Sequence, residues 1–134
     1  MIRAILMASN PILRSGLREF LRQAEDITVT GELSSLEDLP RFATEVDVIV
    51  IALASVPRFD LGRFFPAEGI LPAVLILSDE TADLAGLIRL PARAWGVLPQ
   101  DADAPEIIAA VRSLGEGLIV GSPRLLKPPS DHPG

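Results

Sequence analysis

The sequence predicts an α/β fold: a doubly wound, five-stranded parallel sheet with helices on both faces. Short β-branched or aliphatic runs alternate with amphipathic stretches along the chain, which is the pattern of parallel strands joined by crossover helices. Several of these runs are continuously hydrophobic, as is typical of strands that are buried on both sides. With 134 residues, 49% of them hydrophobic, the chain is long enough for one core, and one domain is expected.

Five runs are predicted to be strands. They cover residues 2–8, 27–31, 46–53, 73–78 and 95–98. The first, third and fourth are almost entirely apolar, which favours central positions in the sheet. The second is the most polar, as expected of a strand at the edge.

The first predicted helix follows the first strand. Asn10 can cap it, and Pro11 suits its first position. One face of this helix is apolar and consists of Ile12, Leu13, Gly16, Leu17, Phe20 and Leu21. Its outer side carries arginines at four-residue steps, namely Arg14, Arg18 and Arg22. This stripe is either a partner-docking surface or a solvated face with mildly unfavourable like charges.

The last predicted helix begins after a second capping signal. Asp103 is followed three residues later by Glu106, which is the spacing of a capping box. Gly115 and Gly117 are expected to end this helix. Prolines and glycines interrupt the segments between the first and last helices, so the middle helices are expected to be short or irregular. The interrupting residues are Pro40, Gly62, Pro66, Gly86 and Pro91.

Composition excludes several classes of function. The chain has no cysteine, which rules out disulfides, thiolate nucleophiles and zinc-thiolate sites. Its net charge of −6 is the wrong sign for a domain that grips nucleic-acid phosphates. We find neither a membrane-spanning apolar run nor a signal-peptide pattern, so a cytoplasmic protein without membrane contact is expected.

The C-terminal segment differs in composition from the rest. Residues 1–121 are predicted to form the domain, and residues 122–134 a proline-rich tail or the start of a linker to an output domain. The single histidine, His132, lies in this tail, where a solvated side chain is expected rather than a metal ligand.

The residues at the carboxyl ends of the predicted strands are the candidates for a site, because ligands of such sheets bind at that edge. These residues are Ala8, Ser9, Asn10, Ala52, Leu53, Ser78, Asp79, Glu80, Pro99, Gln100 and Asp101. No glycine-rich loop follows any of the strands, so a phosphate-cradling nucleotide site is disfavoured.

Several segments carry a resemblance to a known family. The most specific is Asn-Pro-x-x-Arg-x-Gly-Leu at 10–17, and the others lie at 2–6, 47–51, 77–78 and 94–101. Over about residues 2–122 the chain resembles the receiver domain of bacterial two-component response regulators. Within that family it is most similar to the subfamily with a C-terminal LuxR-type helix-turn-helix. The resemblance implies a flavodoxin-like, receiver-type fold.

The family transfers a phosphoryl group from a histidine kinase to an aspartate at the end of strand three. Two carboxylates after strand one hold the Mg²⁺ ion that this chemistry needs. In this sequence the acid pair corresponds to Ala8 and Ser9, and the acceptor corresponds to Ala52. A methyl group has no nucleophilic oxygen. Aspartyl phosphorylation at this position, and with it a bound Mg²⁺, is therefore not expected.

The remaining family positions are also altered. The lysine after strand five corresponds to Gln100, and the aromatic switch residue corresponds to Val97. Only the hydroxyl after strand four, Ser78, matches the family. The single lysine of the chain, Lys127, lies in the tail. The resemblance therefore implies a degenerate receiver with no enzymatic activity and no cofactor.

Displaced polar residues form a second group of candidates. Asp79, Glu80 and Asp101 are either a cation site or solvated loop acids. Together with Asn10 and Trp95 they are a candidate surface for a partner or ligand, although Trp95 could equally cap the core.

Two functions follow from these observations. The first is a pseudo-receiver, a phosphorylation-independent interaction module that forms a homodimer or docks a protein partner and regulates an attached DNA-binding domain. The second is a small-molecule sensor that uses the neutral pocket left at Ala8, Ser9, Ala52 and Gln100. We prefer the first, because loss of the ionic residues removes one function without building a particular ligand site.

Overall fold

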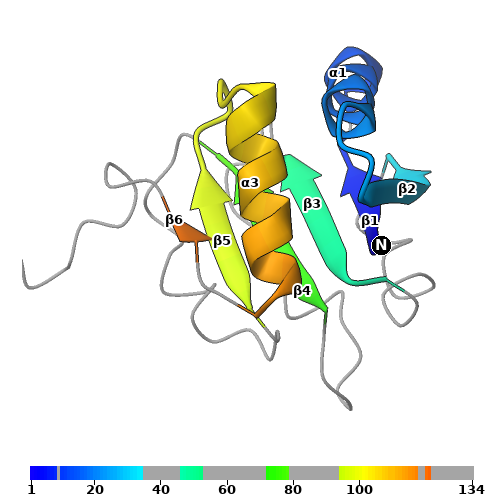
Figure 1. The fold of residues 1–134 in the computed structure, drawn as a ribbon. Coiled ribbons are helices and arrows are strands. Elements are labelled where there is room, and N and C mark those ends of the chain that lie inside the picture. Colours follow the sequence, from blue (N-terminus) through cyan, green and yellow to red (C-terminus); the bar gives the residue numbers. More distant parts are fainter. Residues whose placement is uncertain (9, 35–45, 53–71, 79–93, 118–119, 122–134) are drawn as a thin grey trace, which may run out of the picture.

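The centre of the fold is a parallel sheet of six strands in the order β2-β1-β3-β4-β5-β6 (Figure 1). The computed structural model describes residues 1–8, 10–34, 46–52, 72–78, 94–117 and 120–121. The strands are β1 (Ile2–Met7), β2 (Ile27–Leu33), β3 (Val48–Ala52), β4 (Ala73–Leu77), β5 (Trp95–Leu98) and β6 (Val120–Gly121).

The five predicted strands are confirmed to within two residues at each end. β6 was not predicted. It contains only two residues, which is too short to stand out as an apolar run, and it exists through its pairing with Gly96 and Val97 of β5. The sheet therefore has one more strand than the sequence indicated.

Two helices, α1 (Pro11–Arg22) and α3 (Ala104–Gly115), lie side by side on one face of the sheet. The Asn10 side chain accepts hydrogen bonds from the backbone N–H groups of Ile12 and Leu13 and so caps α1. Asp103 and Glu106 form the predicted capping box of α3. Within the described ranges, no helix is long and apolar enough to cross a bilayer.

The middle helices, expected around Pro40, between Gly62 and Pro66 and between Gly86 and Pro91, lie outside the described residues. Burial of the strands nevertheless bears on the predicted layers. Val48 and Val50 of β3 pack in the core beneath α1 and α3. Ile49 and Ile51 alternate with them along the strand and are also 0% exposed. Both faces of the central strand are therefore buried, as predicted for a sheet between two layers.

An irregularity in β2 changes which of its side chains face α1. Val29 pairs with Ala4, but Gly31 pairs with Ile5, so Thr30 is an extra residue. An extra residue reverses the alternation of faces beyond it. Glu32 consequently pairs with Leu6, whose side chain lies in the core on the α1 face, and the Glu32 carboxylate points to α1.

Candidate functional site

Three of the predicted site residues meet at the carboxyl edge of the sheet. Ala8 directly follows β1, Ala52 ends β3 and Ser78 directly follows β4. The strand register aligns these ends, because Met7 pairs with Ile51 and Ala52 pairs with Leu77. The Ser78 N–H donates to the Leu98 carbonyl at 2.9 Å, which extends the same edge to β5. The structure thus brings Ala8, Ala52 and Ser78 together as the sequence predicted.

The chemistry available at this edge is limited. Ala8 is 0% exposed and Ala52 is 5% exposed, and both present only methyl groups. Ser78 is the only buried polar residue among the described residues, at 7% exposure. The described ranges contain no group of three or more acidic, histidine or cysteine residues that could hold a metal ion. Ser9, Asp79 and Glu80 lie outside these ranges.

The candidates on and after β5 occupy different environments. Val97 is 1% exposed and pairs with Ile76 inside the sheet. Gln100 is half-buried and Asp101 is exposed, both in a turn beyond the carboxyl end of β5. Trp95 is half-buried at the opposite, amino-terminal end of the strand. Trp95 therefore does not share a surface with Asp101.

Arginines of the α1 stripe form a cluster with Glu32, a partner that sequence reasoning did not identify. Arg14 Nη1 donates to the Ala8 carbonyl at 2.8 Å, and Arg14 Nε lies 3.6 Å from Glu32 Oε1. Arg18 Nη1 donates to Glu32 Oε2 at 2.9 Å. One strand carboxylate thus holds two arginines of the stripe, and the third, Arg22, pairs with Glu19 of α1 at 3.1 Å.

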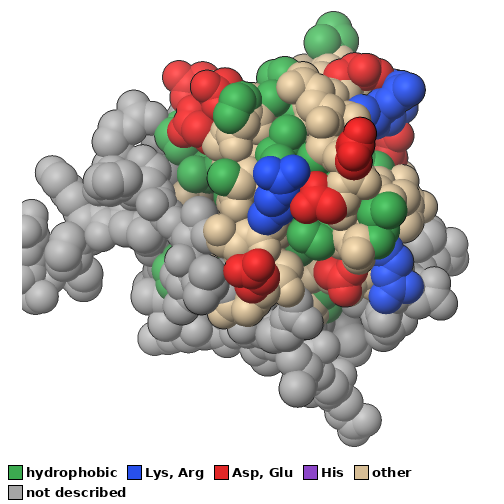
Figure 2. Space-filling model, viewed as in Figure 1, with side chains coloured by type: hydrophobic (Ala, Val, Ile, Leu, Met, Phe, Trp, Pro, Cys, Tyr) green, Lys and Arg blue, Asp and Glu red, His purple; other side chains and the backbone are tan. Residues whose placement is uncertain are grey.

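This cluster partly decides whether the arginine stripe of α1 is a partner-docking surface or a solvated face. Arg14 and Arg18 are not simply solvated, because they tie α1 to β2 and to the carboxyl end of β1. Figure 2 shows the wider setting, in which acidic and basic side chains are interspersed on the face that carries α3. The only signal in the sequence was an acidic residue in an otherwise neutral strand, and alternation alone would have placed Glu32 on the other face.

Comparison with known proteins finds that the chain is similar to response regulators. No family model matches it. It is 28% identical over 131 residues to the response regulator UvrY of Escherichia coli strain K12, and equally to UvrY of Shigella flexneri. These alignments cover 87% of this chain and 56% of the relative. The chain therefore spans about half the length of the curated relatives that it matches.

Solved structures agree with the sequence relatives. The response regulator ChrA of a heme-sensing two-component system has a TM-score of 0.67 and 28% identity, covering 99% of this chain and 67% of ChrA. A LuxR-family response regulator from Aurantimonas sp. SI85-9A1 shares the fold at TM-score 0.72 and 17% identity, covering 95% and 94%. The receiver domain of RcsB from Escherichia coli also shares the fold, with a TM-score of 0.67 and 18% identity, and the match covers 90% of this chain and 98% of the RcsB domain. Fold and sequence together show that the chain has the receiver-domain fold and that its homologues are LuxR-family response regulators.

Proposed function

We propose that this chain is a pseudo-receiver, a signalling module that regulates through protein contacts without being phosphorylated. The observation that carries the proposal is the residue at the end of β3. Phosphoryl transfer needs a nucleophilic oxygen in line with the phosphorus atom. Ala52 ends β3, where the resemblance puts the acceptor, and it offers only a methyl group that is 5% exposed.

The neighbouring position supports the same conclusion. Mg²⁺ sheds its water reluctantly and needs carboxylate oxygens to hold it. Ala8, at the end of β1, offers only a backbone carbonyl, and that carbonyl already accepts a hydrogen bond from Arg14. Among the described residues, a cation at this edge is the Arg14 guanidinium, whose Nε lies 3.6 Å from the Glu32 carboxylate.

The function of the whole protein follows as a proposal from its relatives. The curated relatives are nearly twice as long as the part that this chain matches. RcsB of Salmonella typhimurium shares the fold at 20% identity, and its structure was solved to study conformational dynamism for DNA interaction. We propose that this domain regulates a DNA-binding output domain, either by forming a homodimer or by docking a protein partner.

Acetyl phosphate with Mg²⁺ tests the proposal directly. The treated protein should keep its intact mass, and its amide spectrum should be unchanged by Mg²⁺ with beryllofluoride. The isolated receiver domain of RcsB from Salmonella enterica, which has been solved in the presence of the phosphomimetic BeF3⁻, is treated in parallel as the positive control for reagents and conditions. Gain of one phosphoryl mass, or saturable shifts clustered around residues 8, 52 and 78, would overturn the proposal.

A small-molecule sensor is the alternative proposal, and the uncharged side chains of Ala8, Ala52 and Ser78 are what favour it. A ligand that binds the folded state raises its stability by mass action. A thermal-shift screen with a metabolite panel separates the two functions. A saturable increase in Tm that is lost in an Ala52→Leu variant would favour the sensor.

A further inference from the structure

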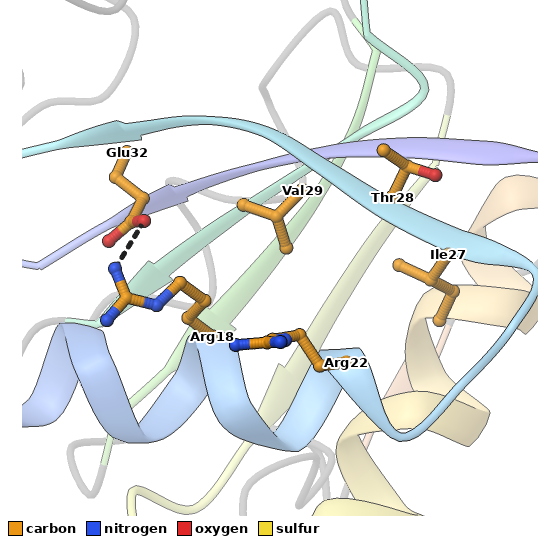
Figure 3. Close-up of a pocket in the computed structure, with 6 residues that line it drawn as sticks. All are labelled: Arg18, Arg22, Ile27, Thr28, Val29 and Glu32. Carbon is orange, nitrogen blue, oxygen red and sulfur yellow. Dashed lines mark hydrogen bonds and ion pairs between the residues drawn. The ribbon is translucent and has the colours of Figure 1, made fainter.

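An open groove of about 430 Å³ runs between α1 and the edge strand β2 (Figure 3). Its lining consists of Arg18, Arg22, Ile27, Thr28, Val29 and Glu32. Ile27 is buried and Val29 half-buried, so the floor is partly apolar. The two arginines reach over it from α1, and Glu32 closes one end through its ion pair with Arg18.

β2, the strand that borders this groove, is an edge strand among the described strands of the sheet. β2 stands at one end of the strand order, and β6 occupies the other end beside β5. Within the part of the chain that the structure describes, no strand pairs with the outer side of β2. Thr28 and Thr30 of this strand are exposed. An edge of this kind presents unpaired backbone groups to which an extended segment can add.

The charges of the groove indicate what such a segment would carry. Arg22 is 69% exposed, and its only described ion pair is with Glu19, which is 61% exposed. Ion pairs between such exposed side chains contribute little to stability, so Arg22 can readily exchange Glu19 for another carboxylate. Two arginines against one glutamate leave the lining net positive, in a chain whose net charge is −6.

We propose that the α1–β2 groove binds an acidic, extended segment of a partner protein, which adds to the edge of β2 as a further strand. Alternate side chains of an added strand point to the same face. One of them would lie on Val29, and a carboxylate would lie beside Arg22. Backbone hydrogen bonds would supply affinity, and the groove would supply selectivity for acidic residues.

The irregularity at Thr30 limits this surface to short ligands. A bulge breaks the regular ladder and reverses the faces beyond it, so the regular stretches of β2 are only three residues long, Ile27–Val29 before the bulge and Gly31–Leu33 after it. The same break opposes symmetrical pairing of two β2 strands, because opposite residues would point to different faces. A partner segment therefore fits this edge better than a second copy of the chain does.

Fluorescence anisotropy with short labelled peptides tests the proposal. The probe is a Glu-Ser-Val-Ser-Glu peptide, which places its valine and both glutamates on one face of the strand, and a Lys-Ser-Val-Ser-Lys peptide controls for charge. Arg22→Ala should weaken binding of the acidic probe about tenfold, the effect of losing one well-placed charge contact. Arg3→Ala is the matched control: it removes the same charge from an exposed arginine outside the groove and should change binding less than about twofold.

A backbone N-methylated acidic probe tests the strand-addition part, because it cannot donate the ladder hydrogen bonds, and it should bind at least about tenfold more weakly. No binding of the acidic probe up to about 1 mM, where binding free energy is only about −4 kcal/mol, would overturn the proposal. Equal effects of Arg22→Ala and Arg3→Ala would also overturn it, since only net charge would then matter. This result is independent of phosphorylation: a positive acetyl phosphate test would remove the pseudo-receiver function and leave the groove proposal intact.

Discussion

Replacing Glu32 by glutamine removes the charge that joins α1 to β2. In the folded protein its two carboxylate oxygens lie 2.9 Å from Arg18 Nη1 and 3.6 Å from Arg14 Nε. The Glu32→Gln variant keeps the shape of the side chain and leaves two neighbouring arginines without their shared anion. We expect the free energy of unfolding to fall.

The exposure of the three side chains sets the magnitude. The side chain of Glu32 is 27% exposed, that of Arg14 is 23% exposed and that of Arg18 is 41% exposed. The cluster is therefore intermediate between a buried ion-pair network and an ion pair on the surface. Exposed pairs contribute about 0–1 kcal/mol, and hydrogen bonds to charged groups contribute about 1.5–3 kcal/mol. A loss of about 1.5 kcal/mol is therefore expected, which lowers the urea midpoint by about 1 M for a chain of this size.

Glu19→Gln provides the matched control, because it removes the same charge from α1. Glu19 and Arg22 are 61% and 69% exposed, so this variant should lose less than about 0.5 kcal/mol. Urea unfolding of both variants should be followed by circular dichroism at low and high salt, since salt should diminish the difference. Equal destabilisation by the two substitutions would refute the argument that Glu32 holds a partly buried cluster.

Two further predictions concern stability. The Arg112 guanidinium hydrogen-bonds to the Asp26 carboxylate and lowers its pKa. A carboxyl whose pKa is lower in the folded state adds stability above its unfolded pKa and loses it as the pH falls through the folded pKa. Urea midpoints measured from about pH 5 to pH 2 should therefore decline more steeply in the wild type than in Asp26→Asn, and equal slopes would contradict this. A Cβ on Gly16 meets nothing within 4 Å, so Gly16→Ala should raise the free energy of unfolding by about 0.5–1 kcal/mol. Gly115→Ala should not, because its Cβ would come within 3.2 Å of the Ile2 side chain, and a thermal melt of both variants decides the point.

The candidate site at the carboxyl edge of the sheet was largely predictable from the sequence. Each of its positions ends an apolar run, and in a parallel sheet the carboxyl ends of neighbouring strands meet at one edge. Ala8, Ala52 and Ser78 therefore meet where the runs that precede them end. The two helix caps were predictable for a similar reason, because Asn10 and Asp103 bond to backbone groups only two or three residues away.

The ion pairs could not be predicted from the sequence, because their partners lie far apart along the chain. Arg18 and Glu32 are 14 residues apart, and Arg112 and Asp26 are 86 residues apart. Whether such charges meet depends on register and on which face a strand presents. β6 could not be predicted from the sequence either, since a two-residue strand exists only where another strand is placed to pair with it.

The sequence by itself determined the α/β class, the order of most elements, their caps and the absence of a side-chain oxygen at Ala52, the last residue of β3, because these depend on neighbouring residues and on side-chain identity. Only the tertiary structure decided that one extra residue at Thr30 turns Glu32 toward α1. That reversal binds two arginines to a single carboxylate and shapes the groove beside the open edge. Faces and long-range pairs are set by how strands align in space, which no local pattern encodes.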